Sequence, residues 1–399
     1  MNGKTRFEEL AICGTAPAFA SPLHVGRPNL PDRERLLARI GEVLDRDWLS
    51  NNGPCVQEFE RQLAKLLGVE HCIAMCNATI GLEIAARALD FRGEVIVPSM
   101  TFIATPHALQ WQQITPVFCD IDPDTHNLDP RCIEELITPR TTGIVGVHLW
   151  GRACDVAAIT EIARRHRLRL LFDAAHAVAC TYQGRPIGGE GDAAVFSFHA
   201  TKFFNTFEGG AVATNDTALA RKIRLMKNFG FAGYDNVIHL GINGKMTEPA
   251  AAMGLASLES IEDFRVINQR NYRTYAARLG TIAGLRLLAY DEKEQNNYQY
   301  IVVEVDERRA GLTRDELQRV LHAENVLARR YFYPGCHRME PYRTVYPLAR
   351  WHLPVTEAVV ARVLVLPTGT SIGEAEIQTI CDVLTLALGN PELTRNRLQ

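Results

Sequence analysis

The chain has 399 residues, of which 47% are hydrophobic and 22% are charged, and its formal net charge is −3. One hydrophobic core usually supports no more than roughly 250 to 300 residues, so this length predicts one large domain and one smaller domain. The composition is that of an ordinary globular protein. Without an excess of positive charge, it gives no indication of binding to nucleic acid or to a membrane surface.

Ten cysteines are scattered along the chain, mostly inside apolar stretches, without CxxC pairs and without a secretory leader. We interpret them as buried, reduced thiols. Cys72 and Cys76 lie near His71, but their spacing fits no usual metal site, so we expect no bound metal. No apolar run approaches the ~18 residues of a membrane span. A cytoplasmic enzyme is the simplest class that fits.

Short apolar runs alternate with stretches typical of helices between about residues 70 and 215. This alternation predicts a large α/β domain with a seven-stranded, mostly parallel sheet. Polar residues follow most of the runs, where ligands bind in sheets of this kind. The predicted strands are 72–76, 94–97, 115–119, 143–147, 169–172, 193–197 and 210–213.

The pattern changes past residue 255. We expect a long polar helix from Glu259 to about Leu279, a strand within 298–305, and a helix from Thr313 that begins with a Thr-x-x-Glu capping box. These elements predict a smaller C-terminal α+β domain. We therefore divide the chain into residues 1–260, the large domain with an N-terminal arm, and residues 261–399.

Lys202 follows the sixth predicted strand, among hydroxyl, aromatic and glycine residues. A lysine in this setting can be desolvated, which lowers its pKa and allows it to form a Schiff base. Asp173 ends the fifth strand, where its carboxylate would hold a pyridine nitrogen protonated. Most lysines are solvated surface charges, and a strand-end aspartate often only caps a helix. Together the pair is typical of a pyridoxal phosphate site.

Other residues would complete such a site. Ala78 and Thr79 open a helix directly after the first strand, so their backbone amides would face a bound phosphate. Ser197 would add a hydroxyl, and Phe102 would stack on the ring. The plainer alternatives are a helix cap for the first two and an ordinary core position for Phe102.

Several runs resemble the DegT/DnrJ/StrS family of sugar nucleotide aminotransferases, namely 173–176, 191–202 and 208–216. Further blocks at 48–60, 98–105, 115–122 and 241–246 follow in the family's order, so the resemblance extends from about residue 25 to 390. It implies a fold-type I, pyridoxal phosphate-dependent transaminase. It also implies that Lys202 is the Schiff-base lysine, that Asp173 binds the pyridine nitrogen, and that His176 lies beside the ring near its phenolic oxygen.

The same resemblance places Ala78, Thr79 and Ser197 on the phosphate and Phe102 on the ring. Asn243 would reach the phosphate of the neighbouring subunit's cofactor, which implies a homodimer with shared active sites. The chain departs from common family patterns in three places: Cys76-Asn77-Ala78 stands for Ser-Gly-Thr, His176 for Gln, and Gly244-Lys245 for Tyr-Arg.

The loop 331–343 contains aromatic residues, a histidine and two arginines, a combination that suits a nucleotide sugar. We expect Tyr331, His337 and Arg338 to contact the substrate. The loop looks most like that of enzymes that aminate dTDP-4-keto-6-deoxyglucose at C4, with glutamate as the family's usual donor, on antibiotic or surface-sugar pathways.

Amination at C3 and a UDP-linked substrate remain alternatives. Relatives that dehydrate sugars carry histidine in place of the imine lysine, so Lys202 favours transamination over a sugar dehydratase. A non-catalytic, cofactor-binding regulator is less favoured, because no basic patch or DNA-binding helix pair supports it.

Overall fold

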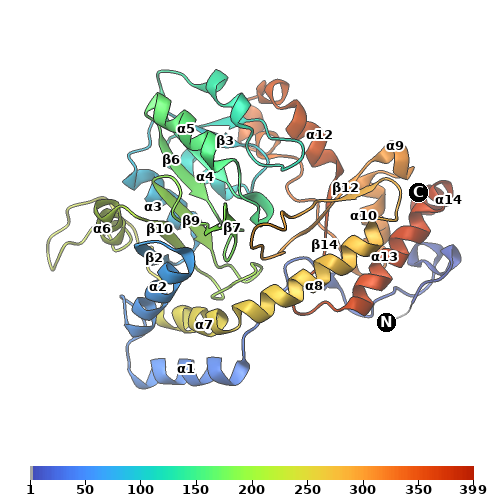
Figure 1. Ribbon diagram of the computed structural model, residues 1–399, viewed down its shortest axis with the longest axis horizontal. Coiled ribbons are helices and arrows are strands. Elements are labelled where there is room, and N and C mark those ends of the chain that lie inside the picture. The colour runs from blue at the N-terminus through green and yellow to red at the C-terminus, as the bar shows by residue number, and fades with distance from the viewer. Residues whose placement is uncertain (1–2) are drawn as a thin grey trace.

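Seven strands form the large sheet of the computed structural model, which describes residues 3–399 (Figure 1). Their order is β2-β10-β9-β6-β5-β3-β4. β10 runs antiparallel to both neighbours, and every other adjacent pair is parallel. All seven predicted strands are present, and the predicted fold class is confirmed. The strands are β2 (His71–Met75), β3 (Glu94–Pro98), β4 (Thr115–Cys119), β5 (Thr141–Val147), β6 (Arg169–Asp173), β9 (Ala193–Ser197) and β10 (Gly210–Thr214).

Helices cover both faces of this sheet, which is why its strands are continuous apolar runs. Successive residues of β2 point to opposite faces: Cys72 and Ala74 belong to one buried cluster, Ile73 and Met75 to another. The first cluster includes residues of α2 (Pro54–Leu67), α5 (Val156–His166) and α7 (Glu248–Glu259). The second includes residues of α3 (Ala78–Ala88), α4 (Ala104–Gln110) and α6 (Thr217–Met226).

The strand directions bring the predicted site residues to one edge of the sheet. β2 and β9 are parallel to each other, because both run antiparallel to β10 between them. The carboxyl ends of β2, β9, β6, β5, β3 and β4 therefore share one edge. Ligands of α/β sheets bind at this edge.

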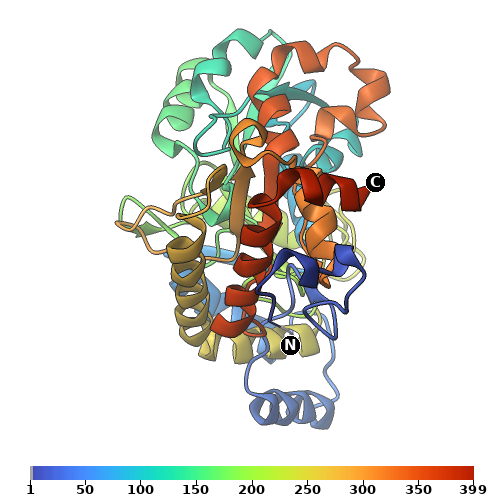
Figure 2. The same ribbon diagram turned by 90° about the vertical axis from the view of Figure 1, so that its right-hand side faces the viewer.

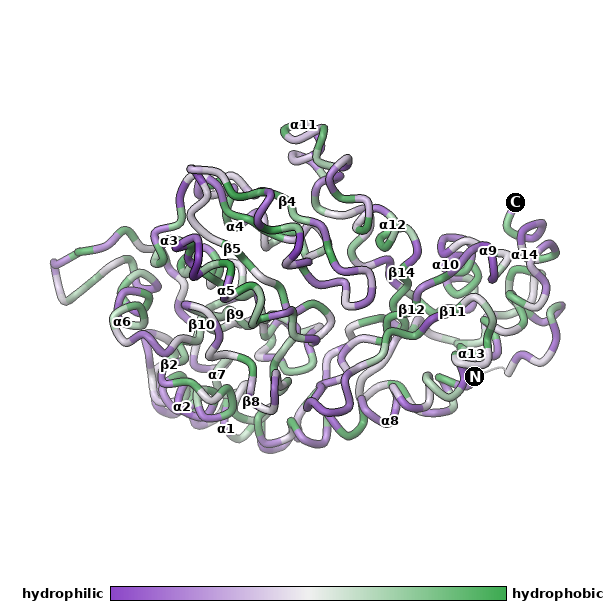
Figure 3. Tube along the Cα trace, turned by 45° about the horizontal axis from the view of Figure 1, so that its top comes forward, coloured by the Kyte–Doolittle hydropathy of each residue, from purple (hydrophilic) through white to green (hydrophobic). Residues whose placement is uncertain are grey.

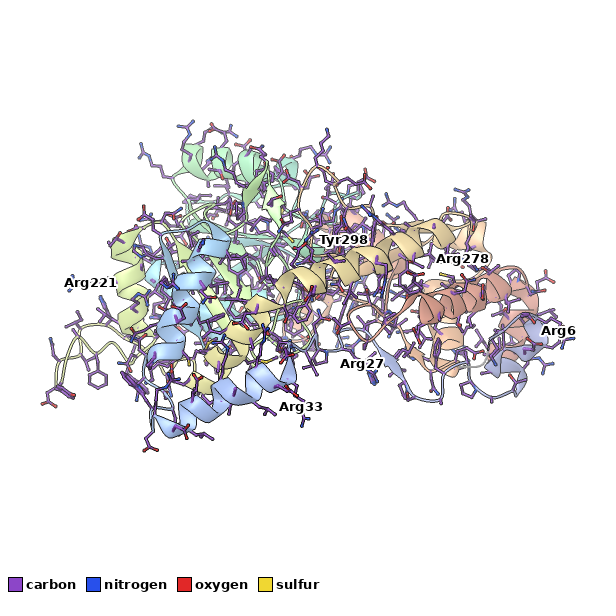
Figure 4. The ribbon with its side chains drawn as sticks, turned by 60° about the horizontal axis from the view of Figure 1, so that its bottom comes forward. Arg6, Arg27, Arg33, Arg221, Arg278 and Tyr298 are labelled. Carbon is purple, nitrogen blue, oxygen red and sulfur yellow. The ribbon has the colours of Figure 1, made fainter. Side chains whose placement is uncertain are left out.

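A smaller antiparallel sheet, β11 (Leu285–Leu287), β12 (Ile301–Val305) and β14 (Val363–Leu366), packs against α8 (Ile261–Leu279), α10 (Arg314–Ala323) and α13 (Glu374–Leu388). α8 runs from the end of α7 toward the C-terminal helices, with Arg278 near its far end (Figure 4). The helix predicted from Glu259 starts at Ile261, because α7 ends at Glu259. The predicted capping box is present: the Thr313 hydroxyl accepts from the Glu316 amide at 3.1 Å, and the Glu316 carboxylate accepts from the Thr313 amide at 2.7 Å.

The first part of the chain packs against the C-terminal part. Phe7 and Phe19 share a buried cluster with Leu364. β1 (Leu23–His24) pairs in parallel with β13 (Val326–Leu327). Figure 2 shows this N-terminal segment beside α13. The division between residues 260 and 261 stays a prediction, and the segment before α1 shares the core of the C-terminal part.

Two segments project from the molecule: the loop that follows α6, and α11 (Tyr342–Val345) (Figure 3). None of the helices within residues 3–399 is both long and apolar enough to cross a membrane. The remaining α-helices and strands are α1 (Arg33–Asp45), α9 (Glu307–Ala310), α12 (Pro354–Arg362), α14 (Pro391–Leu398), β7 (Thr181–Tyr182) and β8 (Arg185–Pro186). The short 3-10 helices are η1 (Phe7–Glu9), η2 (Ala11–Cys13), η3 (Pro130–Cys132), η4 (Glu134–Leu136), η5 (Leu149–Gly151), η6 (Cys336–Arg338) and η7 (Ala349–His352).

Candidate active site

A cavity of about 570 Å³, here called the first cavity, lies at the carboxyl edge of the large sheet. The loops after β2, β3, β6 and β9 supply most of its wall, and Tyr300 and Phe332 close it from the C-terminal part. Most of the predicted site residues meet here, although they come from five separate segments. Those that line the cavity are Ala78, Thr79, Phe102, Asp173, His176, Ser197, Lys202 and Tyr331.

Lys202 is held by a loop whose aromatic residues are anchored in the core. Phe198 and Phe204, on either side of the lysine, are fully buried and lie 5.2 Å apart between ring centroids. Phe59 of α2 packs against both rings. Loss of solvent around Lys202 lowers the pKa of its ammonium to about 8, although the negative charge of Asp173 acts in the opposite direction. A substantial fraction of this lysine is therefore a neutral amine near pH 8.

Asp173 is buried at the end of β6, and its carboxylate has two donors of its own. Oδ2 accepts from the Thr105 hydroxyl at 2.7 Å, and Oδ1 accepts from the Ala175 amide at 3.1 Å. Burial raises the pKa of this carboxyl, while these hydrogen bonds and the charge of Lys202 lower it. The Thr101 hydroxyl lies 2.9 Å from that of Thr105. Thr105 was not among the residues predicted from the sequence, where its position four residues after Thr101, near the start of a helix, was the available signal.

The ring of His176 is fixed by backbone as well as by aromatic neighbours. The Trp150 amide donates to His176 Nδ1 at 3.2 Å, so the ring proton resides on Nε2. Tyr300 lies 4.7 Å and Phe332 lies 6.0 Å from the His176 ring centroid. Burial, together with the charge of Lys202, holds the pKa of His176 well below its ordinary value. His176 is therefore a neutral hydrogen-bond donor in the cavity wall.

Trp150 is in turn held by a hydrogen-bonded chain that reaches the smaller sheet. Its backbone has a φ of 63°, in the left-handed region that non-glycine residues rarely adopt. Its indole Nε1 donates to His126 Nδ1 at 3.2 Å, and His126 Nε2 bonds Glu304 of β12 at 2.9 Å. Arg286 and Arg362 also pair with Glu304.

The start of α3 forms an anion cradle. The side chain of Asn77 caps the helix by accepting from the Ile80 amide at 2.9 Å, and the amides of Ala78 and Thr79 have no partner within residues 3–399. A Cβ at Gly210 would lie 2.7 Å from the Ala78 nitrogen, so a glycine is required where β10 passes the helix start. Free amides at a helix N-terminus bind phosphate well.

The structure places three predicted residues outside the first cavity. His337 is buried, with Nδ1 2.6 Å from the Ser99 hydroxyl and Nε2 2.7 Å from the Glu357 carboxylate. Arg338 pairs with the same carboxylate. In this structure their polar groups hold the loop 331–343, and their contact with the substrate stays a prediction. Asn243 is exposed on the segment after α6, where its backbone forms a bridge with Asn228.

Comparison with known proteins identifies the family to which the chain belongs. The model of the DegT/DnrJ/EryC1/StrS aminotransferase family matches residues 31–385. The chain belongs to this family. Family members named dTDP-4-amino-4,6-dideoxy-D-glucose transaminase are 39% identical in Shigella dysenteriae (81% of this chain, 88% of the relative) and 35% identical in Escherichia coli (90% and 97%). A crystal structure of DesI in the presence of its TDP-sugar product is 50% identical, with a TM-score of 0.94 over 98% of this chain and all of that one.

Members of the DegT/DnrJ/EryC1/StrS family are sugar nucleotide aminotransferases, and pyridoxal 5′-phosphate is their cofactor. The residues of the first cavity fit this group. The amides at the start of α3 match a phosphate, Asp173 is an acceptor suited to a protonated ring nitrogen, and Lys202 is an amine with a lowered pKa. The structure thus joins free helix-start amides, a buried carboxylate and a lysine of lowered pKa in one cavity.

Proposed function

We propose that this enzyme aminates C4 of dTDP-4-keto-6-deoxy-D-glucose to give the 4-amino-4,6-dideoxy sugar, with L-glutamate as donor. The main support for transamination is the presence of Lys202 and Asp173 in one cavity. The names of the relatives at 39% and 35% identity, and the TDP-sugar in the DesI structure, support the choice of sugar. The pathway would supply an amino sugar to an antibiotic or a surface polysaccharide.

The proposed roles follow from the chemistry of each side chain. The amides of Ala78 and Thr79 and the Ser197 hydroxyl bind the cofactor phosphate, and Phe102 stacks on the ring. The Asp173 carboxylate keeps the ring nitrogen protonated, with Thr105 orienting it. Neutral His176 donates from Nε2 to the phenolic oxygen. These contacts orient the ring and exclude water from one side of it.

Lys202 performs the proton transfers. When bound, pyridoxal phosphate acts as an electron sink for the substrate carbon next to the amino nitrogen. Lys202 would hold the cofactor at rest, and a donor amine would free its side chain. Its free amine then removes the proton from the donor carbon and later delivers a proton to the sugar carbon that becomes aminated. The lowered pKa favours this role, because the neutral form is the base.

We also propose that the enzyme acts in the cytoplasm as a homodimer with shared active sites, in which Asn243 of each subunit binds the cofactor phosphate of the other. The support is the location of Asn243: its side chain is exposed and does not line its own subunit's first cavity, at the base of the loop that follows α6. Lys245, two residues further on, lies on the same segment.

Incubation with dTDP-4-keto-6-deoxyglucose and nitrogen-15-labelled glutamate tests the proposal. We expect the label at C4 of the product, by mass spectrometry and NMR. Lys202→Ala should abolish the product and the visible absorption of covalently held cofactor. Lys222→Ala is a matched control, because Lys222 pairs with Asp90 on the surface.

Other outcomes of this experiment would contradict the proposal. Loss of a hydroxyl without nitrogen incorporation would identify a dehydratase. Label at C3, or turnover only with a UDP-linked sugar, would replace the proposed substrate. Cofactor binding without turnover of any keto sugar would indicate a regulator.

A further inference from the structure

The N-terminal segment before α1 contacts the chain on both sides of Lys202. Before the lysine, a Cβ at Gly26 would lie 3.0 Å from the Thr201 Cβ, so the two segments pass in close contact. After the lysine, the Asn29 side chain donates from Nδ2 to the Phe203 carbonyl at 2.9 Å. Within residues 3–399 no other protein group donates to this carbonyl. The backbone position of Lys202 therefore depends on a segment that is distant in the sequence.

Asn29 is buried, and both ends of its side-chain amide are occupied. Its Oδ1 accepts from the backbone amide of Thr370 in the C-terminal part at 2.9 Å. Its backbone carbonyl accepts from Asn205 Nδ2 at 2.8 Å, which attaches a second residue of the Lys202 loop to the same position. One asparagine thus joins the N-terminal segment, the loop that carries Lys202 and the C-terminal part.

The contacts of the Asn29 side chain require an amide. Asparagine offers a donor at one end and an acceptor at the other, which match the Phe203 carbonyl and the Thr370 amide. Aspartate keeps only the acceptor, and alanine keeps neither group. Phe203 is itself buried, with its ring packed against Phe264 of α8. Without Asn29 its carbonyl would be a buried acceptor with no donor, so the backbone next to Lys202 would have to shift to regain one.

We propose that Asn29 is a positioning residue for Lys202, which fixes the lysine backbone and ties it to the C-terminal part. Asn29 does not line the first cavity, so it acts only through the chain that carries the lysine. From this one backbone anchor, Lys202 has to hold the cofactor and, once freed, to transfer protons. A displacement of about 1 Å in a reacting group can lower a rate about 100-fold. The inference rests on the proposed function, since it assumes these two roles of Lys202.

Two forms of the cofactor separate the positioning of Lys202 from general damage to the cavity. Pyridoxal phosphate reacts with the lysine amine with loss of one water, whereas pyridoxamine phosphate binds without a bond to Lys202. Asn29→Ala should slow covalent loading of cofactor-free enzyme about 10-fold to 100-fold and lower kcat to a similar extent. Its affinity for pyridoxamine phosphate should stay that of wild type. Stopped-flow absorbance measures the loading, and titration of the protein fluorescence measures the affinity.

Two further variants isolate the contact between Asn29 and Phe203. Asn29→Asp keeps the shape of the side chain and the acceptor for the Thr370 amide, so it should fold and still load slowly. Asn325→Gly is the matched control, because Asn325 Nδ2 donates to the Phe19 carbonyl of the N-terminal segment at 2.7 Å, away from the Lys202 loop. Glycine also suits its φ of 62°. This control should load at the wild-type rate.

Failure of this inference is distinguishable from failure of the proposed function. If wild-type enzyme shows no covalent loading, or if Lys202→Ala retains it, the proposed function is wrong. If wild type loads and transfers nitrogen but both Asn29 variants load as fast, Asn29 does not position Lys202. Equal losses of loading and of pyridoxamine phosphate binding would assign Asn29 to packing of the cavity. Slow loading by Asn325→Gly would assign the effect to docking of the whole N-terminal segment, and either result overturns the inference.

Discussion

At the scale of single residues, Lys202 and Asp173 share one desolvated cavity and affect each other's charge. Burial lowers the pKa of Lys202 and raises that of Asp173, and each charge partly offsets the burial of the other. The Thr105 hydroxyl and the Ala175 amide stabilise the ionised Asp173 further. The pair thus combines a base that is neutral near pH 8 with a carboxylate that is fixed in position.

The lowered pKa of Lys202 predicts how the rate of covalent cofactor attachment depends on pH. The neutral amine is the attacking form, and its fraction rises with pH until the pKa of about 8 is passed. We expect the rate of covalent loading of cofactor-free enzyme to rise to about pH 8 and then level off. Stopped-flow absorbance at a series of pH values measures this rate. A rate that keeps rising toward pH 10, as for an ordinary solvated lysine, would contradict the assignment.

The substitution Thr105→Val tests how much one hydroxyl contributes to stabilising the ionised Asp173 carboxylate. The change keeps the shape of the side chain and removes the donor to Oδ2, which leaves a buried carboxylate with one fewer hydrogen bond. A hydrogen bond to a charged group contributes about 1.5 to 3 kcal/mol, so kcat should fall by about 10-fold or more. Thr101→Val removes a hydroxyl whose only hydrogen-bond partner within residues 3–399 is that of Thr105, and it should have a smaller effect. Equal losses in the two variants would show that general packing is responsible.

At the scale of elements, the turn after β5 connects the first cavity to the smaller sheet. The Trp150 backbone fixes the tautomer of His176, and the Trp150 indole is held through His126 by Glu304 of β12. The hydrogen bond from His126 and the neighbouring positive charges lower the pKa of Glu304 to about 2, against the effect of its burial. Glu304 therefore remains ionised at neutral pH. As an ionised acceptor it takes the Nε2 proton of His126, which leaves His126 Nδ1 to accept from the Trp150 indole.

Trp150→Phe tests whether this chain reaches the cofactor. Phenylalanine retains an aromatic ring against Phe332 but leaves His126 Nδ1 without its donor, which should cost about 1 to 3 kcal/mol of unfolding free energy. We also expect weaker cofactor binding and a shifted pH dependence of the bound cofactor's spectrum, because the turn no longer fixes His176. Trp111→Phe, at an exposed position, is the control. A loss of stability with unchanged cofactor binding and spectrum would limit Trp150 to a structural role.

The strands, and the meeting of the residues at their carboxyl ends in one cavity, were predictable because their signals are local. Each strand is a continuous apolar run, and Lys202, Asp173, Ala78 and Thr79 directly follow or end one. The loop 331–343 was different, since the polar groups of His337 are occupied by Ser99 and Glu357, residues distant in the sequence. Local composition marked that loop as polar and aromatic, but the partners that occupy its polar groups come from the tertiary fold.

At the scale of the whole molecule, the loop after α6 presents apolar side chains that its own subunit does not cover. Tyr234 is fully exposed, and Leu240 and Val237 are exposed at 71% and 56%. Exposed apolar clusters of this kind mark interaction surfaces. Asn243 lies at the end of the same loop, and its proposed role on the partner's cofactor requires that this loop be buried against a second copy.

Mixed dimers test this arrangement. Lys202→Ala removes the reactive lysine, and Asn243→Asp places a carboxylate against the cofactor phosphate, so each homodimer should have little or no activity. A heterodimer isolated with two different affinity tags carries both changes in one site and neither in the other, provided that Asn243 serves the opposite subunit. It should recover about half of the wild-type activity per dimer, since one of two sites is intact. An inactive heterodimer would mean that each subunit completes its own site, and an active Asn243→Asp homodimer would show that Asn243 does not bind the phosphate.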